Sequence, residues 1–282
     1  MSSAEVEKML RDIRQLPSLS VVVLEILDSF KDEGLKIPEL VRKIGRDQGL
    51  AARVLRVANS AFLGFPSKVA SINEAVVVLG FHTVRSLALA AGVIQQFPPG
   101  EGNRAFDRLA FWQHAIGVGV AARVLAQKLG RNQEEAFTAG LLHDIGRLVL
   151  DAYFHDSFLG ILSRAGEEDC LLVSAEKKVL GLDHAEIGYE VARQWKFPLP
   201  VQLAIRGHHN PDAPSSELAD LVHFANVLAH GLEIGNSGYD QVPPLAAGAW
   251  RRLGLEWNAV AACLPEIERL NAGATLLVAE SA

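Results

Sequence analysis

Cysteine is nearly absent from this sequence. Among its 282 residues, Cys170 and Cys263 are the only two cysteines, and they form no CxxC pair. Two isolated thiols exclude both the disulfide framework of a small secreted domain and a zinc site built from cysteines. The residues after Met1 lack the apolar core of a signal peptide, and no run of about 18 apolar residues occurs. These absences predict a cytoplasmic protein that does not cross a membrane.

Positive charge is also in deficit. The chain has 27 Lys and Arg against 33 Asp and Glu, which gives a net charge of −6. This balance argues against broad attraction to nucleic acid or to an anionic membrane surface. Apolar residues, by contrast, make up 49% of the sequence. In a chain of this length they suffice to bury a hydrophobic core.

Apolar residues recur at helical spacing along most of the chain, and no stretch alternates in the way a long strand would. Ser71 with Glu74, and Asp183 with Glu186, form the capping-box pattern that marks the start of a helix. The clearest break lies at residues 97–103, where two prolines and two glycines cannot continue a helix. The pattern predicts an all-α protein with a subdomain boundary at this break.

A histidine and an aspartate stand side by side at His143-Asp144, in an otherwise apolar run. Burying both groups is costly unless each finds a partner. Histidines on other predicted helices lie at separations that could bring them to the same place. In chain order, the candidate metal ligands are His114, His143, Asp144, His184, His208 and His209, followed by Asn226.

Imidazole and carboxylate ligands together suit a divalent ion of iron, manganese, zinc or nickel, whereas the lack of cysteine ligands argues against a structural zinc site. Neighbouring residues of a helix point about 100° apart. A carboxylate that bridges two ions would therefore use His143-Asp144 better than chelation of one ion by the pair. The alternative is that these histidines are ordinary core or surface residues. His82, His155 and His230 are not accompanied by other candidate ligands, and we assign them to the ordinary core or surface residues.

The order of these residues carries a family resemblance. His143-Asp144 stands in a Leu-Leu-His-Asp-Ile-Gly-Arg-Leu context, His184 begins His-Ala-Glu-Ile-Gly-Tyr, and His208-His209 precede Asn210-Pro211. This order resembles the HD superfamily of metal-dependent phosphohydrolases, nearest to its HD-GYP branch. The N-terminal part resembles the narrower HDOD family through four stretches, namely residues 16–19, 44–50, 55–62 and 71–80.

The HDOD resemblance implies an all-α signalling module, usually bacterial and cytoplasmic, in which an N-terminal helical bundle packs on an HD-like helical subdomain. We expect the HDOD domain at residues 14–211, with an N-terminal half at 14–97 and an HD-like half at 104–211, which residues 212–282 complete. HDOD proteins generally resemble hydrolases that have lost metal ligands. Here the matching positions from His114 to His209 are all filled by ligand-competent residues, which implies a divalent-metal site.

Three departures from the hydrolase pattern bear on activity. The position of the final aspartate holds Asn226, whose neutral amide is a poorer metal ligand than a carboxylate, although His223 or Asp220 could substitute for it. Arg147 replaces the usual lysine and keeps its charge but not its compact geometry. The Gly-Tyr-Pro motif that helps to bind cyclic dinucleotides is absent after His209.

The leading hypothesis is a signal-transduction output or scaffold module without catalytic residues. It would act through a signalling protein partner and retain a metal site, which Arg147, Asn226 and His223 could help to line. The rival is a metal-dependent phosphohydrolase with the same ligands, in which Arg147 steadies phosphate charge.

Two further expectations concern partners and input. A helix-turn-helix at residues 38–60 would contact DNA, but the net negative charge disfavours it, so nucleic acid is not an expected partner. A nucleotide ligand stays open. Because the HDOD-like pattern begins near Met1, we expect the input signal to arrive through another chain.

Overall fold

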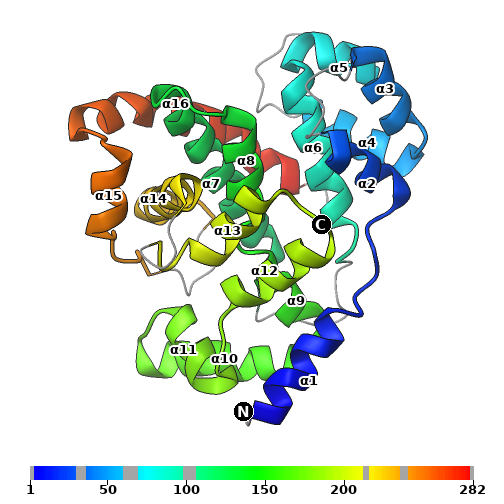
Figure 1. Ribbon diagram of the computed structural model, residues 1–282. Helices are drawn as coiled ribbons and strands as arrows, with labels where there is room; N and C mark the ends of the chain where they lie inside the picture. Colours follow the sequence, from blue (N-terminus) through cyan, green and yellow to red (C-terminus); the bar gives the residue numbers. More distant parts are fainter. Residues whose placement is uncertain are drawn as a thin grey trace. The chain divides into compact units, whose positions relative to one another are not determined.

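The computed structural model describes residues 3–29, 36–59, 69–97, 106–211, 216–235 and 241–279 (Figure 1). The described residues form helices and no strand, which confirms the all-α fold. The break predicted at 97–103 lies outside the described residues from Pro98 on, as does the end of the 55–62 motif. Contacts divide the chain into two compact units. Unit 1 comprises Met1–Leu16 and Pro99–Ile267, and unit 2 comprises Pro17–Pro98 and Glu268–Ala282.

Unit 2 contains α2 (Val21–Asp28), α3 (Ile37–Gly45), α4 (Gln48–Ala58), α5 (Ile72–Leu79) and α6 (Phe81–Ile94). Ser20 and Ser71 cap α2 and α5, because each hydroxyl accepts the backbone N–H three residues further on. Arg46, in the stretch considered as a helix-turn-helix, donates to both carboxylate oxygens of Glu25 at 3.0 Å. This arginine is therefore paired within the unit.

Unit 1 holds the remaining helices and all candidate metal ligands. The helices that it contains are α1 (Ser3–Ile13), α7 (Arg108–Lys128), α8 (Gln133–Leu142), α9 (Ile145–Tyr153), α10 (His155–Glu168), α11 (Leu172–Leu180), α12 (His184–Gln194), α13 (Leu199–Gly207), α14 (Glu217–Gly231) and α15 (Ala247–Leu253). The last helix, α16 (Trp257–Ala279), begins in unit 1, and its residues from Glu268 on belong to unit 2.

Helix α7 is the core of unit 1 and packs against α8 and α14. Asp107 caps its start by accepting the N–H of Ala110 at 2.9 Å, and Gly130 follows its end at φ +65°. Among the described residues, α7 is the only helix long and apolar enough to cross a membrane. However, 78% of its most apolar window is buried within the fold. This burial is typical of a helix in a protein core, and the cytoplasmic location stays a prediction.

Two glycines bring the site-bearing helices close together. Gly140 of α8 lies against α7, where a Cβ on this residue would sit 2.8 Å from the Cα of Gly119. Gly146 of α9 lies against the start of α12, where a Cβ would overlap the carbonyl oxygen of His184. Only a residue without a side chain permits such close approach of backbones. These contacts hold the connection between α8 and α9 next to both α7 and α12.

Candidate metal centre

The predicted ligands lie at helix ends. Helix α8 ends at Leu142 and α9 begins at Ile145, so His143 and Asp144 form the turn between them. The expectation that this pair lies within one helix was wrong, and the turn changes the directions in which the two side chains point. His184 is the first residue of α12, after the N-cap Asp183, as the capping box predicts. His208 follows the last residue of α13, and His209 comes next.

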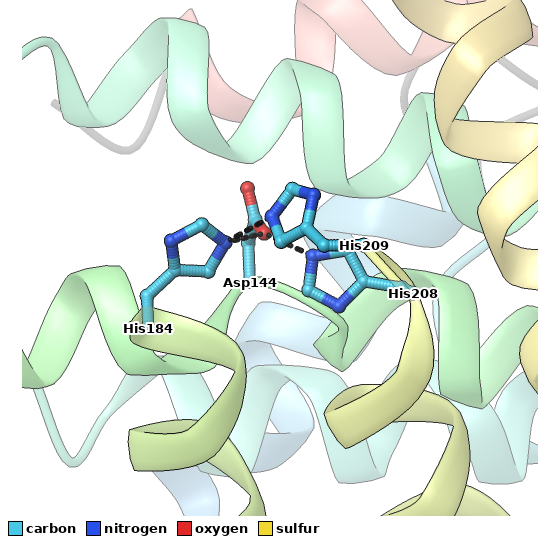
Figure 2. A group of neighbouring side chains, drawn as sticks. All are labelled: Asp144, His184, His208 and His209. Carbon is cyan, nitrogen blue, oxygen red and sulfur yellow. Dashed lines mark hydrogen bonds and ion pairs between the residues drawn. The ribbon is translucent and has the colours of Figure 1, made fainter. Parts of the chain in front are cut away.

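Four of these side chains converge (Figure 2). Asp144 Oδ1 lies 3.3 Å from His143 Nε2, 3.0 Å from His184 Nε2 and 3.2 Å from His208 Nε2. His209 Nε2 lies 2.8 Å from His184 Nε2. Except for His209, which is partly exposed, these side chains are buried. Residues from three separate connections therefore meet around one carboxylate oxygen.

The contacts of the other ring nitrogen, Nδ1, show where each imidazole carries its hydrogen. His143 Nδ1 lies 2.7 Å from the carbonyl oxygen of Gly140, and His208 Nδ1 lies 2.7 Å from that of Ile205. His184 Nδ1 lies 2.6 Å from a carboxylate oxygen of Glu176. These oxygens only accept hydrogen bonds, so each Nδ1 carries a hydrogen. In a neutral ring, Nε2 then carries a lone pair, and at His143 and His208 this lone pair faces Asp144.

This arrangement places hydrogen-bond acceptors of two imidazoles opposite an acceptor oxygen of Asp144. The Nε2 atoms of His143 and His208, and Oδ1 of Asp144, are buried without a hydrogen-bond partner among the described residues. Buried acceptors that converge without a donor are unfavourable. A cation bound between them would satisfy all of them at once. The donor set, a carboxylate oxygen with several imidazole nitrogens, suits a divalent ion, and the residues therefore fit the metal that the sequence suggested.

The electrostatics of the centre agree with this chemistry. Burial lowers the pKa of His143 well below its usual value, which keeps this imidazole neutral. Burial alone would raise the pKa of Asp144, but interactions with the neighbouring imidazoles, among them a hydrogen bond from the protonated His184, outweigh burial and hold that pKa well below its usual value. Burial lowers the pKa of His184, but the carboxylates of Glu176 and Asp144 outweigh it and raise the pKa to about 10. Without an ion, His184 therefore holds a proton that a metal would have to displace.

His114 lies at the edge of this centre. One ring nitrogen of His114, one of His143 and a carboxylate oxygen of Asp144 lie within 4.8 Å of one another. His114 Nδ1 lies 3.2 Å from the carbonyl oxygen of Ile234, and its Nε2 lies 2.9 Å from Oδ1 of Asn226. Because Nδ1 must donate to the carbonyl, the neutral ring offers a lone pair at Nε2, which the amide group of Asn226 can satisfy by turning over. Asn226 thus contacts a candidate ligand.

The two residues considered as substitutes for the final aspartate point elsewhere. Asp220 accepts from the guanidinium of Arg252 at 2.7 and 2.8 Å. His223 Nδ1 donates to the carbonyl oxygen of His208 at 2.7 Å, and its Nε2 accepts the N–H of Ala246 at 3.0 Å. Both ring nitrogens of His223 are therefore engaged outside the centre. The expectation that His223 or Asp220 replaces Asn226 does not fit these contacts.

A cavity opens onto the centre. Its polar lining comes from Asp144, Arg147, His184, His209, Asn226, His230 and Gln241, and its apolar lining from Leu171, Leu172, Val173 and Pro243. Arg147 donates to Oδ2 of Asp144 at 3.1 Å, which leaves Oδ1 to the imidazoles. A cationic side chain therefore lines the same space as the candidate ligands.

Sequence reasoning missed two residues of this region. His230 was assigned to the background, yet it lines the cavity, and its ring centroid lies 4.3 Å from that of His114. Its position four residues after Asn226 on one predicted helix was an available signal. Glu176 carries no motif, and only the packing of α11 brings it to His184. His155, by contrast, is 42% exposed, as expected of a background histidine.

Comparisons with known proteins agree with this fold. The family model for the HDOD domain matches residues 16–211. A protein of Shewanella amazonensis SB2B, named a putative phosphohydrolase, has a similar structure with a TM-score of 0.78, at 31% identity over 96% of this chain and 97% of that one. A putative signal transduction protein of Marinobacter aquaeolei VT8 has a TM-score of 0.80, at 26% identity over 95% of this chain and 61% of that one.

Sequence relatives add one further fact. An uncharacterized protein of Treponema pallidum (strain Nichols) is 29% identical over 248 residues, which are 86% of this chain and 46% of the relative. A ribonuclease Y of Geobacter sulfurreducens is 31% identical over 118 residues, 42% of this chain and 18% of the relative. The chain thus spans less than half the length of these curated relatives.

Proposed function

Because this chain belongs to the HDOD family, whose model covers most of it, we propose that it is a bacterial signal-transduction module with a divalent metal ion bound in its HD-like half. The observation that carries the proposal is that the Nε2 atoms of His143 and His208 meet Oδ1 of Asp144 in a buried site, where none of the three atoms has a hydrogen-bond partner among the described residues. The signalling role is supported by the Marinobacter relative, which is named a putative signal transduction protein.

The proposed ligands of the ion are His143, Asp144, His184, His208 and His209, with His114 beside them. The carboxylates of Asp144 and Glu176 and the guanidinium of Arg147 are charged groups that belong to these ligands or contact them. A divalent ion would leave this centre with a surplus of positive charge, which favours an anionic ligand in the adjoining cavity. Iron, manganese, zinc and nickel all suit the donor set.

We infer a role in binding rather than in hydrolysis, because Asn226 supplies a neutral amide to His114 where a carboxylate would add charge for a second ion. The protein would then present its metal centre, or the helices around it, to a signalling partner in the cytoplasm. A nucleotide is one anionic ligand of suitable charge.

The second candidate is a metal-dependent phosphohydrolase. It is favoured by the cavity, which brings Arg147 to the same space as Asp144, His184 and His209, and by the name of the Shewanella relative. When bound, a divalent ion supplies Lewis acidity and an activated water. In that case Arg147 would hold a phosphate oxygen, and the apolar residues at 171–173 would contact the rest of the substrate.

One experiment separates these candidates. The full chain is purified without chelators, its metal content is measured, and hydrolysis of bis(4-nitrophenyl) phosphate is assayed with added manganese or iron. We expect about one ion per chain, loss of that ion in Asp144→Asn, retention in the exposed control His155→Gln, and no turnover. Absence of metal would overturn the proposal. Metal-dependent turnover that Asp144→Asn abolishes would instead establish the hydrolase.

A further inference from the structure

Glu176 is a buried carboxylate whose hydrogen bonds, in the described part of the chain, all go to one residue, His184. It lies on α11, and it is the least exposed acidic side chain in the described part of the chain, at 0% exposure. Its Oε1 has no hydrogen-bond partner among the described residues. The neighbouring Lys177 pairs with Asp183 at 2.9 Å instead. Burying a carboxylate is unfavourable unless its contacts compensate for the lost hydration, so the contacts of Oε2 must account for its position.

Both contacts of Oε2 are made to His184. This oxygen accepts the backbone N–H of His184 at 2.9 Å and the ring Nδ1–H at 2.6 Å. The first bond fixes the start of α12 and the second fixes the orientation of the ring. Together they direct the other ring nitrogen, Nε2, at Oδ1 of Asp144, 3.0 Å away. Glu176 therefore acts on the candidate centre only through this imidazole.

The three imidazoles around Asp144 differ in the group that accepts a hydrogen bond from Nδ1. Backbone carbonyl oxygens, which are neutral, hold His143 and His208, each at 2.7 Å. A carboxylate holds His184. Hydrogen bonds to charged acceptors are stronger than those to neutral ones, and a carboxylate behind a histidine raises the basicity of its ligand nitrogen. Of the three, His184 is thus the ring whose donor strength depends on a side chain.

We propose that Glu176 is a positioning residue for the metal: it holds His184 in the Nδ1–H form and adds negative charge to a centre in which Asn226 supplies none. This inference rests on the proposed metal site. It assigns to α11 a role in metal affinity that no residue motif of that helix indicates.

The test compares three proteins of full length. Glu176→Gln keeps the size and an accepting oxygen but removes the charge, and Glu176→Asp keeps the charge on a shorter side chain. Asp151→Asn makes the same carboxylate-to-amide change at another buried acid, which pairs with Arg108 away from the candidate ligands. Manganese affinity is measured by equilibrium dialysis, and the proton on each nitrogen of His184 is located by ¹⁵N NMR of the metal-free protein.

We expect Glu176→Gln to weaken manganese binding about 10- to 100-fold, Asp151→Asn to leave it unchanged, and Glu176→Asp to retain more affinity than the amide. The NMR signal of the Nδ1 proton should be present in the wild type and diminished in Glu176→Gln. Equal affinity of Glu176→Gln and the wild type would overturn this inference alone, as would an equal loss in Asp151→Asn. A wild type that binds no manganese would overturn the proposed function and this inference together. If Glu176→Gln does not fold, affinity in Glu176→Asp below the wild type supports the inference, and unchanged affinity there overturns it.

Discussion

Raising the pH of the metal-free protein should lower its free energy of unfolding in a window set by His184. Burial lowers the pKa of this imidazole, but Glu176 and Asp144 outweigh burial and raise it to about 10, whereas the unfolded chain has the ordinary value of 6.5. Between these two values the folded protein holds a proton that the unfolded chain has released. Stability from this group is therefore complete below pH 6.5 and is lost as the pH rises toward 10.

The size of this loss of stability follows from the difference in bound protons between the folded and the unfolded chain. Each pH unit inside the window costs about 1.4 kcal/mol for one proton. Raising the pH from 7 to 8.5 should thus remove about 2 kcal/mol, a large part of the stability of an ordinary domain. His143 and His209 do not offset the loss. Their pKa values are lowered by burial, so both residues are neutral in the folded and unfolded chains above pH 7.

The assay is urea unfolding at both pH values, followed by circular dichroism in the presence of a chelator. The decline should vanish in His184→Gln and persist in His155→Gln, which changes an exposed imidazole. Loading with metal should also remove it, because the ion displaces the Nε2 proton. An identical decline in the wild type and His184→Gln would refute the reasoning.

Three more predictions concern packing, charge and capping. Gly146→Ala should destabilise the protein by about 1–3 kcal/mol in urea unfolding, because its methyl group would overlap the carbonyl oxygen of His184. Gly160→Ala, in open space on α10, should be neutral or stabilising, and an equal loss at both sites would contradict the argument. Asn226→Asp should raise the metal content from one ion per chain toward two, since a carboxylate binds divalent ions better than an amide; unchanged stoichiometry would count against the role given to this residue. Asp183→Ala should cost about 1 kcal/mol through loss of the capping box of α12, and an unchanged unfolding midpoint would show that the cap contributes nothing.

The sequence by itself determined the local structure. Helical periodicity and side-chain caps act between residues three or four apart, and so the all-α fold and the start of α12 after Asp183 could be read from neighbouring residues. The identity of the candidate ligands could also be read, because imidazole and carboxylate groups recur in a family pattern. That pattern names His143 and Asp144 without stating how they are oriented.

Only the tertiary structure decided which atoms meet. His143 and Asp144 lie in a turn between two helices, and contacts at Gly140 and Gly146 set the position of that turn. The approach of Glu176 to His184 likewise depends on how α11 packs, which no local spacing encodes. Convergence of side chains from separate helices is a property of helix packing. For that reason the sequence suggested a metal site, whereas the unsatisfied acceptors around Asp144, which argue for a cation, became visible only in the folded chain.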